Sequence, residues 1–347
     1  MHILIIQQKM IGDVLSTSLL CEYLTNWNLS VEIDFIANRN TVPVLKNNPF
    51  ISNIIVFQDN FKKDKKVFWN FLKKQKKKEY DIIIDVYGKP ESILITLFTP
   101  AIKKISYYKW YSKWVYTHTV ERSKIENKMI PFSMIHRNQL IEPIVGNKFK
   151  FDQKPKLYLN QMELKKAKKK LAHRNFDIKL IMIAAIGSEE KKTYPLEKLA
   201  EIINHLCNSN KAEFLLNYIP NQQDQIERLF SLLNNKTKKK LILKTSPTNL
   251  RDFIGLLSQC DAIVGNEGGA INMGKALNIP SFAIFSPLIE KNDWSSESKK
   301  HIAIHLNDFY PEYFIKKINK KDVPRLYNKL EFSLFKKSFQ IFIKNLF

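Results

Sequence analysis

The glycines of this chain cluster in a segment whose residue types suggest phosphate binding. The chain has 347 residues and nine glycines, and three of these lie together in IVGNEGGAINMGKALNIPSFAIFSP, as Gly265, Gly268 and Gly269. The turn follows an apolar strand pattern and precedes a helix pattern that starts near Ala270. Glycines let backbone N–H groups approach a ligand closely, and a helix start adds donors and partial positive charge. The turn therefore predicts a phosphate or diphosphate site, with a tight turn needed only for packing as the alternative.

Two polar side chains in the same turn, Glu267 and Asn272, favour the phosphate interpretation. A second strand–loop–helix segment is AAIGSEEKKTYP, residues 184–195. Lysine is a compact, mobile cation suited to a diphosphate leaving group. The side chains of this loop that could meet phosphate oxygens are Ser188, Lys191, Lys192 and Thr193. A solvated loop of the same composition is the alternative.

A third turn carries a candidate base. In QQKMIGDVLSTSLL a strand pattern ends, Gly12 makes a turn, and Asp13 opens a helix that also carries Ser16 and Thr17. An aspartate at a helix start is usually a cap. In a cleft between two domains, the same carboxylate could instead remove a proton from a hydroxyl group.

The elements that position these turns alternate as in a parallel α/β sheet. In the first half, strands are predicted at HILII, VEIDFIA, NIIVF, YDIIIDVYG and KKISYY, with helical patterns between most of them. The aromatic and basic region 107–144 breaks the rhythm. The charged stretch GNKFKFDQKPKLYL, residues 146–159, then predicts a linker.

The second half restarts the same pattern. A Lys-rich helix, QMELKKAKKKLAHR, precedes strands predicted at KLIMIAAIG, AEFLLN, KLILK, DAIVG and SFAIF. The fold class is therefore α/β, with two Rossmann-like domains facing across a cleft. We expect the domains at 1–155 and 156–347, and the last helix could pack back on the first domain. Ligands of such sheets bind beyond the carboxyl ends of the strands, which is where the three turns lie.

The charge balance points to an anionic partner. The chain has 56 Lys and Arg against 33 Asp and Glu, a net charge of +23. Nucleic acid, an anionic lipid surface or a phosphorylated substrate would fit, and compositional drift is the alternative. Lys alternates with aromatic residues in FKKDKKVFWNFLKKQKKKEY (61–80) and YYKWYSKWVY (107–116). This mixture favours a membrane–water interface or an anionic glycolipid, with a solvated helix and core aromatics as the alternative.

Several classes of protein are excluded. Cys21, Cys207 and Cys260 lie far apart without Cys-x-x-Cys spacing, so we expect buried thiols in a reducing compartment. Neither a Gly-x-Gly-x-x-Gly nor a P-loop motif occurs, which argues against a standard dinucleotide-binding domain and a P-loop nucleotidase. Without Asp-x-Asp or a His/Cys cluster, no metal is predicted. No signal peptide or membrane-spanning stretch is apparent, so a cytoplasmic protein is expected.

The three turns together resemble the lipopolysaccharide heptosyltransferases, the ADP-heptose-dependent family 9 of GT-B glycosyltransferases. Gly12-Asp13-Val14-Leu15 is similar to the opening motif of that family, and YDIIIDVYGKPES to its strand followed by a helix with a serine, here Ser92. Lys192-Thr193-Tyr194-Pro195 resembles Lys-x-Trp-Pro. GNEGGAINMGKALNIPSFAIFSP resembles the block Asp-Ser/Thr-Gly-x-x-His-x-x-x-Ala-Leu-x-x-Pro. The resemblance runs over most of the chain.

The resemblance implies an inverting transfer of heptose from ADP-heptose to a lipopolysaccharide inner-core acceptor, with no cofactor and no metal. Asp13 is then the base on the acceptor-side domain. The other acceptor-side residues are Gly12, Ser16, Ser92 and His136, although a core-edge helical role also suits His136 and Arg137. The residues at the donor diphosphate are Ser188, Lys192, Glu267, Gly268, Gly269 and Asn272. The nucleoside contact of the family falls at Gln222, with Asp224 close by. The expected partners are the nucleotide sugar, an anionic glycolipid and the cytoplasmic surface of the inner membrane.

Three departures from the family pattern lie in the donor site. Glu267 stands where the family has Asp, Gly268 where it has Ser or Thr, and Asn272 where it has His. These changes leave open a GT-B transferase that uses another nucleotide sugar for surface polysaccharide or O-antigen. A catalytically silent lipid-surface protein is a further alternative. Nucleic-acid binding is remote, because no recognisable module is present and the basic residues are scattered.

Overall fold

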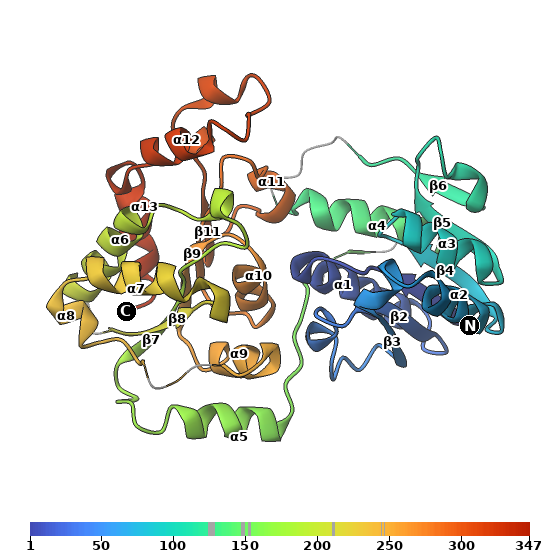
Figure 1. The fold of residues 1–347 in the computed structure, drawn as a ribbon, viewed down its shortest axis with the longest axis horizontal. Helices are drawn as coiled ribbons and strands as arrows, with labels where there is room; N and C mark the ends of the chain where they lie inside the picture. Colours follow the sequence, from blue (N-terminus) through green and yellow to red (C-terminus); the bar gives the residue numbers. More distant parts are fainter. Residues whose placement is uncertain (124–128, 147–149, 152–153, 210–211, 244, 246) are drawn as a thin grey trace. The chain divides into compact units, whose positions relative to one another are not determined.

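The computed structural model describes residues 1–123, 129–146, 150–151, 154–209, 212–243, 245 and 247–347. Two compact units make up the chain, Met1–Tyr158 and Leu159–Phe347, and each is described by itself (Figure 1). Part of the segment interpreted as a linker, 147–149 and 152–153, lies outside the described residues.

The first unit is built on a parallel sheet with the strand order β3-β2-β1-β4-β5-β6. Its strands are β1 (His2–Ile6), β2 (Glu32–Asn38), β3 (Asn53–Phe57), β4 (Tyr80–Asp85), β5 (Ala101–Tyr107) and β6 (His118–Val120). Because all neighbours are parallel, the carboxyl ends of the strands meet at one edge of the sheet. The loops after β1, β4 and β5 therefore lie at the same edge.

The helices of the first unit pack in two pairs. They are α1 (Ile11–Trp27), α2 (Lys65–Lys76), α3 (Pro90–Phe98) and α4 (Phe132–Val145), with short turns η1 (Val42–Val44), η2 (Asp59–Lys62) and η3 (Lys113–Val115). Helix α1 packs against α4, and α2 packs against α3. The apolar sides of α2 and α3 cover the sheet face that carries Leu4, Ile6 and Ile83.

The second unit has a parallel sheet with the strand order β11-β10-β9-β7-β8. The strands are β7 (Lys179–Ala184), β8 (Ala212–Asn217), β9 (Ala262–Asn266), β10 (Ser281–Ile284) and β11 (His301–Ile304). The longer helices are α5 (Gln161–Lys170), α6 (Leu196–Ser209), α7 (Gln223–Leu232), α9 (Leu250–Leu257), α10 (Gly269–Ala276), α12 (Val323–Lys329) and α13 (Phe332–Lys344). The short ones are α8 (Asn235–Lys238), α11 (Lys291–Trp294), η4 (Glu190–Lys192), η5 (Pro220–Gln222), η6 (Leu306–Asp308) and η7 (Pro311–Phe314).

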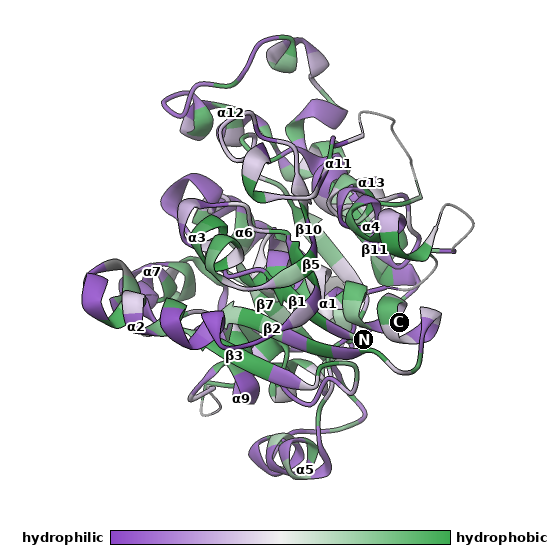
Figure 2. Cartoon of the chain, turned by 90° about the vertical axis from the view of Figure 1, so that its right-hand side faces the viewer, coloured by the Kyte–Doolittle hydropathy of each residue, from purple (hydrophilic) through white to green (hydrophobic). Residues whose placement is uncertain are grey.

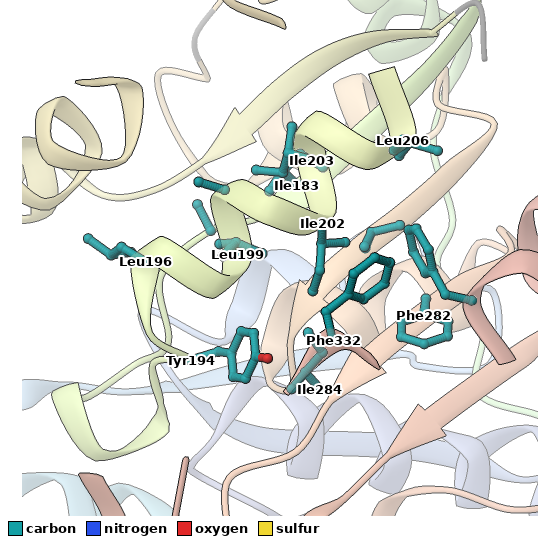
Figure 3. Close-up of a cluster of buried hydrophobic side chains, with 14 of the residues drawn as sticks. Ile183, Tyr194, Leu196, Leu199, Ile202, Ile203, Leu206, Phe282, Ile284 and Phe332 are labelled. Carbon is teal, nitrogen blue, oxygen red and sulfur yellow. The ribbon is translucent and has the colours of Figure 1, made fainter. Parts of the chain in front are cut away.

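The core of the second unit joins α6 and α13 to the sheet. Figure 3 shows Ile202 of α6, Phe282 and Ile284 of β10, and Phe332 of α13 in one apolar cluster. Phe335, Phe339 and Phe342 follow Phe332 at helical spacing and are also buried, and all three rings lie against Phe282. The strands are hydrophobic along most of their length, whereas α5 is largely hydrophilic (Figure 2). Helix α13 thus buries an aromatic stripe on its own unit.

Most predicted elements are present, with a few differences. The strand predicted at KLILK is wrong: only Leu241 forms an isolated bridge, to Phe214, and Lys244 lies outside the described residues. Strands β6 and β11 were not predicted, and α4 was anticipated only as a helical role for His136 and Arg137. Cys21, Cys207 and Cys260 are buried free thiols, as expected. Along the described ranges, no helix combines the length and apolar character that crossing a bilayer requires.

Candidate functional site

One buried amide, Asn266, joins two loops of the second unit. It ends β9, and its Oδ1 accepts a hydrogen bond from the Tyr194 backbone N–H at 2.6 Å. Its Nδ2 donates to the carbonyls of Ala184 and Ala185, at 3.0 and 2.7 Å. The loop after β7 and the turn after β9 are therefore fixed to each other at the carboxyl edge of the sheet. The predicted diphosphate residues of both loops are brought to one place.

The predicted nucleoside residue Gln222 joins the same group of loops. Its Nε2 donates to the Gly187 carbonyl at 3.0 Å, and its Oε1 accepts from the Ile219 N–H at 3.1 Å. Gln222 thus ties η5, after β8, to the loop that carries Ser188 and Lys192. Asp224 is exposed in the first turn of α7.

The clustered glycines serve two different purposes. A Cβ at Gly265 would lie 2.4 Å from the Ala184 carbonyl oxygen, so this glycine lets β9 approach β7. A Cβ at Gly274 would lie 2.7 Å from Ile263 Cγ2, so that glycine seats α10 on β9. Gly268 differs: its φ is +148°, and a Cβ there would meet nothing within 4 Å. The packing alternative therefore accounts for Gly265, whereas the space beside Gly268, at the start of α10, is open.

A carboxylate and two ammonium groups lie near this helix start. Burial raises the pKa of Glu267, and the positive charges of Lys192 and Lys275 oppose that rise. Burial lowers the pKa of Lys275 to about 8, while the Glu267 charge opposes the fall. The Lys275 Nζ donates to the Trp294 carbonyl at 3.0 Å. Lys275 lies one helical turn beyond Asn272 in α10, so a second cation accompanies Lys192.

The aromatic residue of the Lys-x-x-Pro segment anchors its loop. Tyr194 is fully buried, and its hydroxyl donates to the Leu330 carbonyl at 2.5 Å. Its ring meets Tyr327 edge to face, with centroids 5.7 Å apart. Lys192, two residues earlier, keeps a partly exposed side chain whose Nζ lies 3.8 Å from Glu189 Oε1. The buried tyrosine therefore holds the loop while the lysine stays available.

In the first unit, Asp13 is paired with Arg137. The Asp13 Oδ1 lies 2.7 Å from Arg137 Nη2, and its side chain is about one-third exposed (32%). Asp13 does not open α1 as expected: it is the third helical residue, and its Oδ2 accepts from the N–H of the N-cap residue Met10 at 3.3 Å. The Arg137 guanidinium is buried and also donates to Thr17 Oγ1 and the Ser133 carbonyl, at 2.9 and 2.5 Å. Asp13 thus caps α1 through Oδ2, while the fixed guanidinium of Arg137 orients Oδ1.

The other acceptor-side residues differ in exposure. The turn expected at Gly12 is wrong, because α1 already begins at Ile11; Gly12 and Ser16 are buried in its first turns, beside Asp13. His136 is half-buried on α4; its Nε2 lies 3.0 Å from the Ser123 carbonyl, and its ring stacks on Phe132. The structure brings Gly12, Ser16 and Asp13 together through α1, and His136 is adjacent in sequence to the arginine that pairs with Asp13.

Ser92 is fully buried, and its hydroxyl caps α3. The Ser92 Oγ accepts from the Lys89 N–H and donates to the Lys89 carbonyl, both at 3.0 Å. Close by, Asp85 ends β4 and accepts hydrogen bonds from the Gly88 N–H at 2.8 Å and the Tyr116 hydroxyl at 2.7 Å. Burial raises the pKa of Asp85, although these hydrogen bonds oppose the rise. Ser92 therefore has a structural contact in this unit.

Three residues of the candidate site were not assigned to it from the sequence. Arg137 was interpreted as a core-edge residue, and its pairing with Asp13 spans 124 positions of the chain. Asn266 could have been noticed as an amide at the end of a buried strand. Lys275 could have been noticed as the single charged residue of a short helix that is mostly apolar. No group of three or more His, Cys, Asp or Glu within the described ranges is arranged to hold a metal ion.

Sequence comparisons identify similar proteins. The family model described as glycosyltransferase family 9 (heptosyltransferase) matches residues 68–313. A protein of Campylobacter coli named lipopolysaccharide heptosyltransferase 1 is 23% identical over 301 residues, which cover 82% of this chain and 84% of that protein.

Solved structures share the fold over nearly the whole chain. A glycosyl transferase family 9 protein from Veillonella parvula has a TM-score of 0.76 at 14% identity, covering 95% of this chain and 96% of the other. The E. coli heptosyltransferase WaaC with ADP-2-deoxy-2-fluoro heptose has a TM-score of 0.66 at 16% identity, covering 88% and 93%. E. coli ADP-heptose lps heptosyltransferase II has a TM-score of 0.69 at 18% identity, covering 95% and 99%. The two parallel α/β sheets thus form a GT-B-like fold, as predicted.

Proposed function

Since this chain belongs to glycosyltransferase family 9, the heptosyltransferase family, we propose that it transfers heptose from ADP-heptose to a hydroxyl group of a lipopolysaccharide inner-core acceptor. The observation that carries the proposal is the family match over residues 68–313. Two further findings support it: the Campylobacter coli relative is named a lipopolysaccharide heptosyltransferase, and the similar WaaC structure holds a fluorinated ADP-heptose.

We assign donor binding to the second unit. The open start of α10 at Gly268 and Gly269 offers backbone N–H groups to a diphosphate, and Lys192 offers a mobile cation from the loop after β7. Ser188 and Asn272 add polar groups beside them, and we propose Gln222 and Asp224 as the nucleoside contacts, since Gln222 is tied to the same loop through the Gly187 carbonyl. Fixed donors directed at charge that develops in the transition state are often the largest catalytic contribution. We propose that these groups neutralise the departing ADP without a metal ion.

We assign the base to Asp13 of the first unit. The acceptor oxygen forms a bond to the anomeric carbon of heptose, the bond from that carbon to the ADP oxygen breaks, and the acceptor proton passes to the Asp13 carboxylate. The attack inverts the anomeric carbon. The Arg137 contact supports this role because it fixes one carboxylate oxygen, so the orientation of the other is limited. Gly12, Ser16 and His136 remain predicted acceptor-side residues, and Ser92 would act there only by positioning α3, since its buried hydroxyl bonds the Lys89 backbone.

The departures in the donor turn favour one alternative. Glu267, Gly268 and Asn272 replace the aspartate, hydroxyl and imidazole side chains of the family pattern, so another nucleotide sugar for surface polysaccharide or O-antigen could be the donor. Thermal unfolding with ADP, ADP-heptose, UDP-sugars and GDP-sugars separates the two, because a ligand that binds the folded state raises its apparent stability. We expect stabilisation by ADP and ADP-heptose. Stabilisation by a UDP- or GDP-sugar alone would replace the proposed donor.

A further inference from the structure

We propose that an exposed aromatic patch of the first unit docks on an anionic lipid bilayer. The aromatic patch consists of Tyr108, Trp110, Tyr111 and Trp114 in the connection after β5, together with the exposed Leu94 and Leu97 of the adjoining helix α3. Turn η3, which contains Trp114, packs against α3, so the two parts are neighbours. The inference deepens the proposed function, because it rests on an acceptor carried by a membrane lipid.

The rings of the patch are unusually exposed for their size. Trp110 is 78% exposed and Trp114 69%, and Tyr108 and Tyr111 are each nearly half exposed. The two leucines of α3 are each 39% exposed. Single exposed apolar residues are ordinary, but several large ones side by side mark an interaction surface. These four rings are therefore not part of the core, which was the alternative interpretation of this segment.

The patch is held in place rather than loosely attached. Tyr107 and Tyr116, on either side of it, are buried, and the Tyr116 hydroxyl donates to the Asp85 carboxylate. Within the connection, the N–H groups of Ser112 and Lys113 both donate to the Lys109 carbonyl, at 3.1 and 2.9 Å. The Trp114 Nε1 donates to the Tyr111 carbonyl at 3.2 Å, and the Trp110 and Tyr111 rings meet edge to face. The segment therefore loses little conformational freedom when its rings enter the headgroup region of a bilayer.

The charge around the patch selects a lipid surface as the occupant. Between Glu91 and Glu121 the sequence contains four lysines and neither aspartate nor glutamate. Helix α2, which packs against α3, adds Lys65, Lys66, Lys73, Lys74 and Lys76. Indole and phenol rings favour the headgroup region of a bilayer, and lysines beside them are attracted to anionic lipids. Aromatic rings, aliphatic side chains and one sign of charge thus occur together.

The position of the patch suits presentation of a glycolipid. It follows the carboxyl end of β5, and Asp13 follows the carboxyl end of β1 at the same edge of the parallel sheet. A bilayer contacted by the patch would therefore place the sugar of a glycolipid near the edge that carries the predicted base.

Co-sedimentation of the full chain with vesicles tests the inference. The vesicles are phosphatidylcholine alone, or equal parts phosphatidylcholine and phosphatidylglycerol. We expect the native chain to bind the anionic vesicles more tightly, and the Trp110→Ser/Trp114→Ser double variant to bind them about tenfold or more weakly, since it removes two large apolar side chains. Lys113→Glu should weaken binding to the anionic vesicles only.

The matched control is Trp27→Ser, which removes an exposed indole from the end of α1, at the opposite edge of the sheet. It should bind vesicles like the native chain. Native binding by the double variant, or no vesicle binding by the native chain, would overturn the inference, as would self-association that the double variant abolishes. Transfer to an acceptor oligosaccharide without acyl chains should be unchanged in the double variant. Failure of that transfer in the native chain would instead refute the proposed function.

Discussion

At the scale of single residues, the Asp13–Arg137 pair turns a helix cap into a candidate base. An ordinary cap needs only backbone N–H partners, and Asp13 has one in Met10. The buried guanidinium is an additional contact, and it reaches Asp13 from a different helix. A cation of this kind restricts the carboxylate to one orientation, which is what proton removal from a bound hydroxyl requires.

We predict that Asp13→Asn lowers the rate of sugar transfer by about 10²–10⁴-fold, since an amide cannot accept the acceptor proton. Asparagine keeps the size of the side chain and can still cap α1. Transfer rates and thermal unfolding with ADP measure the two effects, and the ADP-induced stabilisation should be retained. Undiminished transfer by this variant would mean that another group takes the proton.

Arg137→Lys tests the orienting contact separately. A lysine keeps the positive charge but cannot contact both Thr17 and Asp13 with a planar fork of donors. We predict a lower kcat with little change in the KM for the donor. His136→Gln is the matched control on the same helix, and it should affect the acceptor KM more than kcat. A change confined to the donor KM would contradict a role for Arg137 at Asp13.

At the scale of elements, the donor loops depend on contacts between strand ends. Asn266 satisfies the Tyr194 N–H and two carbonyls from a buried position, so its loss leaves three backbone groups without that partner. We predict that Asn266→Ala destabilises the second unit by about 1–3 kcal/mol and weakens ADP binding. Asn272→Ala, at a partly exposed position in the first turn of α10, should weaken ADP binding with little change in stability. Thermal unfolding with and without ADP distinguishes the two variants. Equal stability of both would argue against the proposal that Asn266 holds the two loops together.

Helix α10 predicts a pH dependence of donor binding. The pKa of Lys275 is lowered to about 8, so its charge, which offsets that of Glu267, is present below about pH 8 and is lost above it. ADP affinity should therefore fall as the pH rises through about 8, because the diphosphate then faces a carboxylate whose charge only Lys192 still offsets. Calorimetric titrations across this range should show a flatter profile for Lys275→Met. The control is Lys191→Gln, which removes an exposed cation beside Lys192 and should keep the fall in affinity. A native profile without the fall would refute the role of Lys275 in donor binding.

The elements show how far the sequence alone could lead. The strands were predictable because a buried parallel strand is a continuous apolar run between turn residues. KLILK has the same apolar character, but among its described residues, 240–243, only Leu241 forms a bridge, to Phe214. The donor turns were predictable from strand–turn–helix order. Contacts such as Arg137 with Asp13 were not, because nothing local marks a partner more than a hundred positions away.

At the scale of the whole molecule, each unit contains a buried titratable group that affects stability at a different pH. Burial would raise the pKa of Asp34, but hydrogen bonds from Tyr80, Asn53 and Lys78 lower it overall. The stability that this carboxylate contributes to the first unit is present above its ordinary pKa and is lost as the pH falls through the lower folded value. In the second unit, burial lowers the pKa of His305 from 6.5 to about 4.

The histidine gives the clearest test. His305 Nδ1 accepts from the Asn307 N–H at 3.0 Å, which leaves Nε2–H to donate to the Ser286 carbonyl at 3.2 Å; Asp308 and Lys291 are the nearby charges. Between about pH 6.5 and 4, His305 is protonated in the unfolded chain but not in the folded unit. The free energy of unfolding therefore decreases as the pH falls through this range, by up to about 3 kcal/mol. His305→Asn cannot titrate there, so we predict that denaturant unfolding of this variant loses that part of the slope. Asp34→Asn should be less stable than the native chain above the ordinary aspartate pKa, but it should keep the slope between about pH 6.5 and 4 and lose only the part of the slope below that range. An unchanged slope in His305→Asn would show that other groups take up the protons.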